Sequence, residues 1–378
     1  MKVVVDENII FAEEAFAEFD SLNLLNGRSI TNKILMDADV LIVRSITKVD
    51  ENLLQNTPVK FVGTATIGTD HIDFEYLLKT EITFADAKGC NADSVTEYVF
   101  TALLKIAVDE KISLSQKSIG VIGLGNIGSR VAKLAGVLGM KVLKNDPPKE
   151  RGGIGSGYVP LDEILKADII SLHVPLNKAG IDKTVHLLND QNLKKIKEGT
   201  IIINTSRGPV SDNNALLNET RTRHFKLILD VWENEPDINI ELLKKTKIGT
   251  AHIAGYSLEG KANGTKIIYN SLCEYLNKKP VWEPLLKKME NATCSLGQGD
   301  TIEEKLYNLF SSIYNVERDD KKLRGIYNSR TYKIKEHFDN LRKENPVRRE
   351  FSNYTITLQQ KDINFKPLLE AFRFKVKY

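Results

Sequence analysis

The sequence predicts an α/β protein with two doubly wound parallel sheets and a smaller α+β segment at its C-terminal end. Short apolar runs alternate with amphipathic stretches from residue 1 to about residue 280, as they do in chains of parallel α/β units. The apolar runs are nearly continuous, which is typical of strands covered by helices on both faces. After Pro280 the chain carries more charge, and its last part alternates apolar with polar residues.

The first part of the chain supplies the strands of one predicted sheet. Amphipathic stretches at 13–19 and 74–78 lie between these strands and fit helices. The predicted strands are KVVVD (2–6), VLIVR (40–44), VKFVGTA (59–65) and ITFADA (82–87).

A long apolar helix is predicted at 94–108, ahead of the second set of strands. The run KIGTAHIAG (247–255) fits a last strand and loop of this set. The other predicted strands are SIGVIGLG (118–125), MKVLKND (140–146), ADIISLHV (167–174), TIIINTS (200–206) and KLILDVW (226–232).

The tail beyond residue 290 predicts helices and half-buried strands. Asp300 or Thr301 is placed to cap the first helix. Segments 354–358 and 372–376 alternate apolar and polar residues, as half-buried strands do. The apolar faces carry Leu306, Leu309, Phe310 and Ile313 in the first helix, and Ile334, Phe338 and Leu341 in the second.

The charge and the lengths of the apolar runs argue against two classes of partner, nucleic acids and membranes. The net charge of +3 is too small to favour a nucleic-acid partner. No apolar run approaches the ~20 residues that span a bilayer, and the N-terminus lacks the apolar core of a signal peptide. We therefore expect a cytoplasmic protein with neither nucleic acid nor membrane as a partner.

The three cysteines are Cys90, Cys273 and Cys294, an odd number of widely spaced residues without a CxxC pair. This spacing indicates neither a disulfide framework nor a metal site.

A glycine-rich turn predicts a dinucleotide site. Gly123-Leu124-Gly125-Asn126-Ile127-Gly128 follows a predicted strand and opens a predicted helix at 129–138. The glycines allow a tight turn, a close approach of the backbone to a pyrophosphate and close helix–strand packing. Asp146 ends the next strand, 18 residues beyond Gly128, where a carboxylate accepts hydrogen bonds from ribose hydroxyls and repels a 2′-phosphate. The cofactor is therefore expected to be NAD.

Three segments that follow predicted strands carry chemically active side chains. They are 204–209, 229–236 and 250–256, and the carboxyl ends of strands are where ligands bind in open α/β sheets. His252 suits a general base, Glu235 can hold its imidazole, and Arg207 can grip a carboxylate and polarise a C2 oxygen. Taken singly, each residue is more often structural, and spacing alone does not decide between the two roles.

Five motifs together resemble the D-isomer-specific 2-hydroxyacid dehydrogenases. They are GLGNIG (123–128), HVPL (173–176), NTSRGPV (204–210), DVWENEP (230–236) and HIAGYS (252–257), in the family's order. The resemblance implies the catalytic roles of Arg207, Glu235 and His252. It also implies cofactor contacts, which with the glycine turn are Gly123, Gly125, Asn126, Ile127, Gly128, Asp146, Val174, Ser206, Asp230 and Gly255. Val174 stands where the related pattern has a threonine, at the cost of one side-chain hydrogen bond at most.

Loops 43–49, 63–73 and 252–265 resemble the substrate loops of one subfamily, the erythronate-4-phosphate dehydrogenases. This resemblance implies NAD-dependent oxidation of 4-phospho-D-erythronate to 2-oxo-3-hydroxy-4-phosphobutanoate, a step of pyridoxal 5′-phosphate biosynthesis. It further implies a homodimer formed through the C-terminal domain, and substrate contacts at Ser45, Thr66 and Tyr256. Charge adds Arg44 and Lys261 as candidates for the phosphate. Arg348 and Arg349 are expected to form a plain surface cluster, with the cleft of a neighbouring subunit as the alternative.

The expected organisation has three domains. A flavodoxin-like substrate-binding domain comprises 1–93 and 257–284, a Rossmann NAD-binding domain comprises 94–256, and a small α+β dimerisation domain comprises 285–378.

Two alternatives stay open at the level of sequence. One is another D-2-hydroxyacid dehydrogenase, such as D-3-phosphoglycerate dehydrogenase, whose substrate also pairs a carboxylate with a phosphate. The other is a non-catalytic NAD(H)-sensing, corepressor-like protein, because fold does not settle function.

Overall fold

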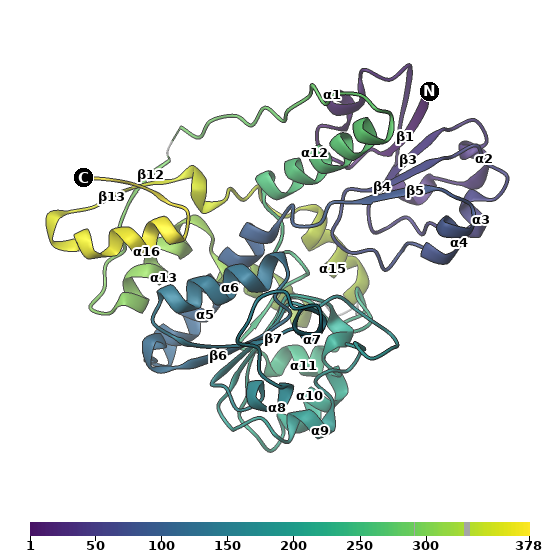
Figure 1. The fold of residues 1–378 in the computed structure, drawn as a ribbon. Coiled ribbons are helices and arrows are strands. Elements are labelled where there is room, and N and C mark those ends of the chain that lie inside the picture. The colour runs from purple at the N-terminus through teal and green to yellow at the C-terminus, as the bar shows by residue number, and fades with distance from the viewer. Residues whose placement is uncertain (291, 329–332) are drawn as a thin grey trace. The chain divides into compact units, whose positions relative to one another are not determined.

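The structure is a computed structural model that describes residues 1–290, 292–328 and 333–378 (Figure 1). The chain divides into two compact units. The first unit comprises 1–91 and 257–288, and the second comprises 92–256 and 289–378. The chain therefore passes from one unit to the other and back, whereas the finer boundaries expected for three domains stay a prediction.

The first unit contains a five-stranded parallel sheet in the order β2-β1-β3-β4-β5. This is the flavodoxin-like order that the sequence predicted. The sequence missed β2, because this edge strand begins with an exposed residue and is half-buried elsewhere, so no continuous apolar run marks it. The strands are β1 (Lys2–Asp6), β2 (Ser21–Leu25), β3 (Val40–Val43), β4 (Phe61–Thr64) and β5 (Thr83–Asp86).

Helix α12 (Leu258–Tyr275) returns the chain to the first unit and packs on β4 and β5. Its buried face includes Ile268, Tyr269 and Leu272, and the ring of Tyr269 lies 6.2 Å from that of Phe16. Residues from both ends of this unit's sequence therefore share one core. The shorter helices of the unit are α1 (Ala12–Phe16), α2 (Asn32–Leu35), α3 (Glu51–Leu54) and α4 (Phe74–Lys79).

The second unit contains a six-stranded parallel sheet in the order β11-β10-β9-β8-β6-β7. The order reverses at β6, which pairs with β7 on one side and β8 on the other, and ligands bind at such a switch point. The strands are β6 (Ser118–Ile122), β7 (Lys141–Asn145), β8 (Ile169–Leu172), β9 (Ile201–Asn204), β10 (Lys226–Leu229) and β11 (Ile248–Gly249).

Both faces of this sheet are buried, as the continuous apolar runs predicted. In β9, Ile201 and Ile203 belong to one core and Ile202 to the other, because successive strand residues point to opposite faces. The long helix α5 (Ala92–Asp109) contributes to the first core together with α6 (Asn126–Val137). Further helices are α7 (Pro147–Arg151), α8 (Leu161–Ile164), α9 (Asp190–Leu193), α10 (Asn213–Glu219) and α11 (Ile240–Lys245).

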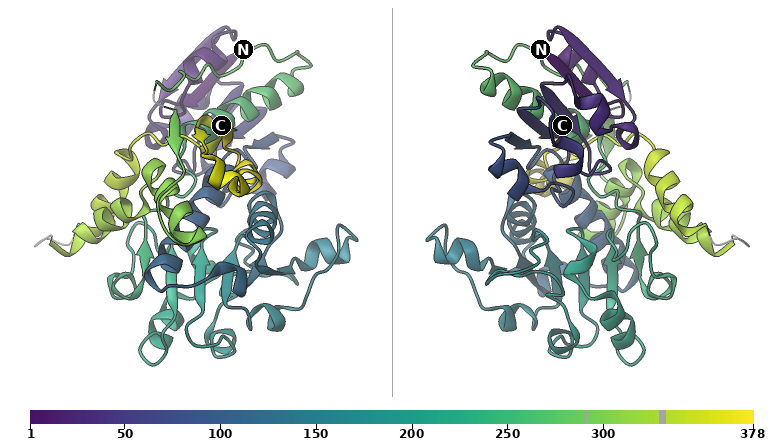
Figure 2. Two further views of the ribbon diagram at one scale, coloured as in Figure 1. Left: turned by 90° about the vertical axis from the view of Figure 1, so that its left-hand side faces the viewer. Right: turned by 90° about the vertical axis from the view of Figure 1, so that its right-hand side faces the viewer.

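The C-terminal segment belongs to the second unit and packs on it through α13 (Ile302–Ile313), which contacts α5. Thr301 caps α13 in a reciprocal arrangement with Glu304, which decides between the two predicted caps. The ring of Phe310 lies 4.6 Å from that of Phe351, within the same core as α5. Figure 2 shows the yellow-green C-terminal helices beside this unit from two sides.

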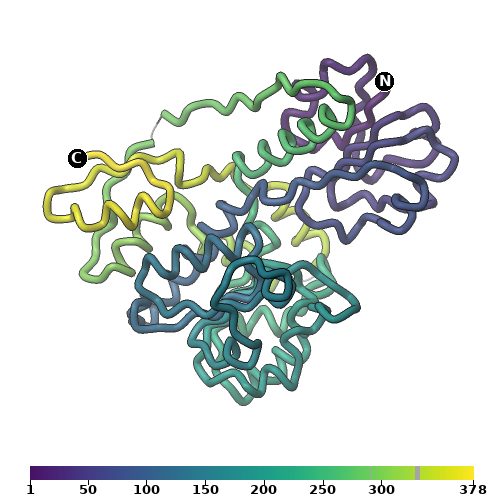
Figure 3. Tube along the Cα trace, viewed as in Figure 1, coloured from purple at the N-terminus to yellow at the C-terminus, as the bar shows by residue number. Residues whose placement is uncertain are grey.

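Three short strands form a parallel sheet in the order β12-β13-β14 at the end of the chain. Figure 3 shows the yellow C-terminal end that carries the last of them. The sequence predicted the last two strands but not β12, α14 or α16. The elements are β12 (Thr293–Ser295), α14 (Val316–Arg324), α15 (Ile334–Lys343), β13 (Thr355–Thr357), α16 (Lys366–Ala371) and β14 (Lys375–Lys377).

Candidate active site

The glycine turn lies between β6 and α6, as predicted, and its backbone requires glycine. Gly123 has φ +85°, and a Cβ atom on Gly128 would overlap the carbonyl oxygen of Gly123. Gly125 is the N-cap of α6 without a side-chain hydrogen bond, and the space beside it is open. The first N–H groups of α6 therefore fit an anion such as the pyrophosphate of a dinucleotide.

Asp146 lies against this turn at the end of β7. One carboxylate oxygen accepts the N–H of Leu124 at 2.8 Å, and the other accepts the N–H of Lys149 at 3.1 Å, which caps α7. Val174 reaches the same turn from β8, since a Cβ atom on Gly123 would meet its side chain. The structure thus brings the predicted cofactor residues of three separate strands together.

His252 and Glu235 form the central pair of the site. Nδ1 of His252 lies 2.7 Å from Oε2 of Glu235, and the other Glu235 oxygen accepts the N–H of Trp232 at 2.7 Å. Burial raises the pKa of Glu235, but the charge and hydrogen bond of His252 outweigh burial and leave this pKa below its ordinary value. An ionised Glu235 can accept but not donate, so Nδ1 carries the proton and the neutral ring keeps its lone pair on Nε2.

Asp230 fixes the loop that carries His252. Its carboxylate accepts the N–H groups of Ile253 and Ala254 and the hydroxyl of Thr250, and its carbonyl oxygen accepts the N–H of His252. Burial raises the pKa of Asp230, against the opposing effects of these hydrogen bonds and of His252. The backbone of His252 is left-handed, with φ 55°, and these bonds hold that conformation in place.

The loop after β9 brings Arg207 next to the segment that carries Glu235. Asn204 Oδ1 accepts both the N–H and the hydroxyl of Ser206, which tightens the turn. A Cβ atom on Gly208 would overlap the carbonyl of Trp232, so the two backbones are in close contact. Arg207 donates to the carbonyl of Ser206 at 2.7 Å.

The first unit places its own candidate residues on loops that follow β3 and β4. Thr66 shares a hydrogen bond of 2.9 Å with Thr64, which also lies 3.1 Å from Nε2 of His71. Ser45 directly follows Arg44, whose guanidinium pairs with the buried carboxylate of Asp6 at 3.0 Å.

Lys261, near the start of α12, lies within reach of the charge of Arg44. Burial, and then this charge, lower the pKa of Lys261. The two basic residues that charge had singled out therefore share one region of the first unit.

Arg342 is a site residue that sequence reasoning missed. Its Nε donates to the hydroxyl of Tyr256 at 3.2 Å, although the two residues are 86 positions apart. It lies near the end of α15, and no motif or periodicity connects this helix with the loop that carries His252.

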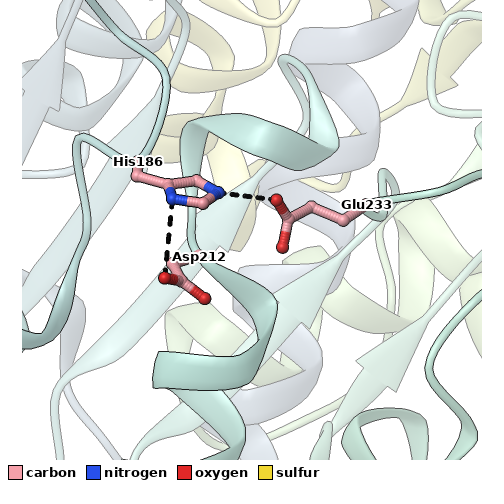
Figure 4. A group of neighbouring side chains, drawn as sticks. All are labelled: His186, Asp212 and Glu233. Carbon is pink, nitrogen blue, oxygen red and sulfur yellow. Dashed lines mark hydrogen bonds and ion pairs between the residues drawn. The ribbon is translucent and has the colours of Figure 1, made fainter.

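A second histidine, His186, lies between two carboxylates (Figure 4). Its Nε2 is 2.7 Å from Oε1 of Glu233, and its Nδ1 is 3.5 Å from Oδ2 of Asp212. These ligand-type atoms lie within 4.8 Å of one another. The two carboxylates face different nitrogens of one ring, which fits a structural contact that joins loops better than a preformed metal centre.

The expectation for Arg348 was wrong, because this residue is buried and does not belong to a surface cluster. Its guanidinium lies 3.1 Å from the carboxylate of Glu97 and donates to the carbonyls of Ser94 and Ala254. The ring of Tyr314 stacks on it at 4.0 Å. Buried hydrogen-bond partners surround the guanidinium, and no local pattern of the sequence indicates them.

Family models match two parts of the chain. Residues 104–254 match the NAD-binding domain of the D-isomer-specific 2-hydroxyacid dehydrogenases, and residues 285–369 match a domain of unknown function. Among solved structures, the chain is similar to a D-lactate dehydrogenase from Aquifex aeolicus complexed with NAD and lactic acid. That similarity has a TM-score of 0.60 and 28% identity, and it covers 73% of this chain and 96% of the other.

An NAD-bound 3-phosphoglycerate dehydrogenase from Entamoeba histolytica is similar with a TM-score of 0.62 and 26% identity, over 73% of this chain and 95% of the other. The fold, the glycine turn and the His252–Glu235 pair thus define the class as NAD-dependent dehydrogenases of the D-2-hydroxyacid type.

Relatives over nearly the whole chain are more specific. An erythronate-4-phosphate dehydrogenase from Proteus mirabilis is 44% identical over 94% of both chains. One from Tolumonas auensis is 45% identical over 95% of this chain and 96% of the relative. The chain belongs to the erythronate-4-phosphate dehydrogenase family.

Proposed function

We propose that this protein oxidises 4-phospho-D-erythronate at C2 and forms 2-oxo-3-hydroxy-4-phosphobutanoate. The observation that carries the proposal is the 2.7 Å contact between His252 and Glu235, in a chain whose relatives with 44–45% identity are erythronate-4-phosphate dehydrogenases. The reaction belongs to pyridoxal 5′-phosphate biosynthesis, as the sequence resemblance implies.

His252 is the proposed acid/base. Its Nε2 takes the proton of the C2 hydroxyl, and Glu235 stabilises the imidazolium that results. Arg207 binds the C2 oxygen and the carboxylate through its planar fork. Bound NAD supplies the hydride acceptor, and α6 with Asp146 provides the groups to hold it.

The further cofactor and substrate contacts stay proposals. Groups of the turn and of the loops after β7, β8, β9, β10 and β11 suit the cofactor, whereas hydroxyls and charges of the loops after β3, β4 and β11 and of α12 suit the substrate. The proposed cofactor contacts are Gly123, Gly125, Asn126, Ile127, Gly128, Asp146, Val174, Ser206, Asp230 and Gly255, and the proposed substrate contacts are Ser45, Thr66, Tyr256, Arg44 and Lys261.

A homodimer through the C-terminal segment is also proposed. Val347 and Ile302 of this segment are 77% and 52% exposed, and they are apolar surface that a second copy can cover. Light scattering on the purified protein tests this state directly. No helix in the described parts of the chain is long and apolar enough to cross a membrane, and a cytoplasmic location stays a prediction.

The test of activity follows the ultraviolet absorbance of NADH with purified protein, NAD and 4-phospho-D-erythronate. D-erythronate, 3-phosphoglycerate, D-lactate and D-glycerate form the comparison panel, and a trap for the 2-oxo acid removes product inhibition. Preference for 4-phospho-D-erythronate supports the proposal. Preference for 3-phosphoglycerate keeps the chemistry and rejects the substrate, and binding of NADH without turnover of any acid favours a sensor.

A further inference from the structure

The guanidinium of Arg342 lies beside the loop that carries His252, the proposed acid/base. Helix α15 carries it, and its Nε donates to the hydroxyl of Tyr256, four residues after His252. The charge of Arg342 also acts on Glu235, whose pKa it helps to lower. A helix of the C-terminal segment therefore contributes a cation to a site that is otherwise built from strand-end loops.

The hydrogen bond between Arg342 and Tyr256 orients both side chains. A guanidinium can only donate, so the phenolic oxygen accepts and the phenol's own proton goes to another acceptor. Among the described residues, the Arg342 side chain makes one hydrogen bond, through Nε, so its two terminal nitrogens can donate to a ligand. The charges of Glu235 and Asp339 also act on this guanidinium.

The proposed substrate carries two anionic groups at opposite ends. Arg207 is assigned to the carboxylate and the adjacent C2 oxygen. A phosphate monoester carries roughly −1.5 to −2 charges at neutral pH and three acceptor oxygens, so it needs a cation of its own. A planar guanidinium matches two of these oxygens at once.

We propose that Arg342 binds the phosphate group of the substrate, in an orientation that its hydrogen bond to Tyr256 sets. The segment that matches a family model of unknown function then contributes a specificity-determining residue to the active site. This inference rests on the proposed function, because that function supplies the phosphorylated substrate.

The test compares kcat/KM for 4-phospho-D-erythronate and for D-erythronate, which lacks the phosphate. In Arg342→Gln, kcat/KM for the phosphorylated acid should fall about 10- to 100-fold, with little change for D-erythronate. Arg342→Lys, which keeps the charge, should restore part of the loss. The control is Lys343→Gln, which removes the same charge from the exposed neighbouring residue and should leave both constants unchanged.

Equal losses on both acids, or no loss on either, would overturn the assignment of Arg342 to the phosphate. Calorimetry with inorganic phosphate gives a second readout, since the wild-type protein should bind it at least tenfold more tightly than Arg342→Gln. This measurement needs no turnover, so it decides the role of Arg342 even if the protein fails to oxidise 4-phospho-D-erythronate. Unchanged phosphate affinity in Arg342→Gln would contradict the inference.

Discussion

At the scale of single residues, the chemistry depends on which nitrogen of His252 is basic. The contact with Glu235 assigns the proton to Nδ1 and leaves Nε2 for the substrate. Replacing His252 with asparagine should lower kcat by about 10²- to 10⁴-fold, because general acid–base catalysis is lost. NADH binding, followed by fluorescence, should stay near the wild-type value, and His224→Asn, at an exposed position, serves as the control. Wild-type turnover in His252→Asn would refute the assignment.

The lowered pKa of Glu235 predicts that this residue stabilises the folded protein in a pH-dependent way. Its folded pKa lies below the ordinary value of 4.5, so its stabilising effect is complete above that pH and is lost as the pH falls through the folded pKa. Glu235→Gln should therefore lower the free energy of unfolding by about 1–3 kcal/mol at neutral pH. Urea unfolding across the pH range from about 7 to 3 checks this. A difference between the two proteins that stays constant down to the acid end would contradict it.

Sequence reasoning paired His252 with Glu235, and the structure shows them in contact, because both residues stand in contiguous motifs. His252 and Glu235 are 17 positions apart, on loops after neighbouring strands, and parallel strand order brings such loops to one edge. Arg342 could not be found in this way, because its contact with Tyr256 depends on how α15 packs. Arg348 was misjudged for the same reason, since its partner Glu97 lies 251 positions away on α5.

At the scale of elements, the junction of β6 and α6 depends on Gly128. A Cβ atom added to Gly128 would overlap the carbonyl oxygen of Gly123, which cannot move without opening the turn. Gly128→Ala should weaken NADH binding at least tenfold and lower the melting temperature, because the helix must shift away from the strand.

Gly136→Ala, in the same helix, is the matched control. Nothing lies within 4 Å of a Cβ atom at that position, so the change should leave NADH binding intact and stabilise the helix by about 0.5–1 kcal/mol. Equal NADH affinity in Gly128→Ala and Gly136→Ala would contradict this prediction, because the turn would then tolerate a shift of α6 away from β6.

The elements that sequence patterns predicted are those with long apolar runs. The buried strands of both large sheets and helix α5 were found within a few residues, because burial on all sides demands apolar side chains. Strand β2 was missed because it is a half-exposed edge strand without a continuous apolar run, and α14 was missed because most of its residues are charged. Such elements owe their structure to packing rather than to local pattern.

At the scale of the whole molecule, the C-terminal segment shares a core with the helices of the nucleotide sheet, and its status as a separate domain stays a prediction. The ring of Phe372 lies 5.1 Å from that of Phe100 in α5, and Arg348 pairs with Glu97 of the same helix. Burial raises the pKa of Glu97 to about 8, so loss of Arg348 would leave a buried carboxyl without its hydrogen-bond donor, at a cost of about 1–3 kcal/mol. The segment therefore contributes to the stability of the second unit.

A chain that ends at residue 284 tests this conclusion. It lacks the partners of Glu97 and exposes the apolar face of α5, so it should not fold cooperatively even in the presence of NAD. Circular dichroism and the binding of a hydrophobic dye should show loss of tertiary structure, whereas a chain that lacks only Tyr378, 63% exposed, should unfold like the full-length protein. If the shortened chain instead unfolded cooperatively and bound NADH, the C-terminal segment would be an independent domain after all. In that case its proposed contribution to the active site through Arg342 would depend on docking between domains rather than on a shared core.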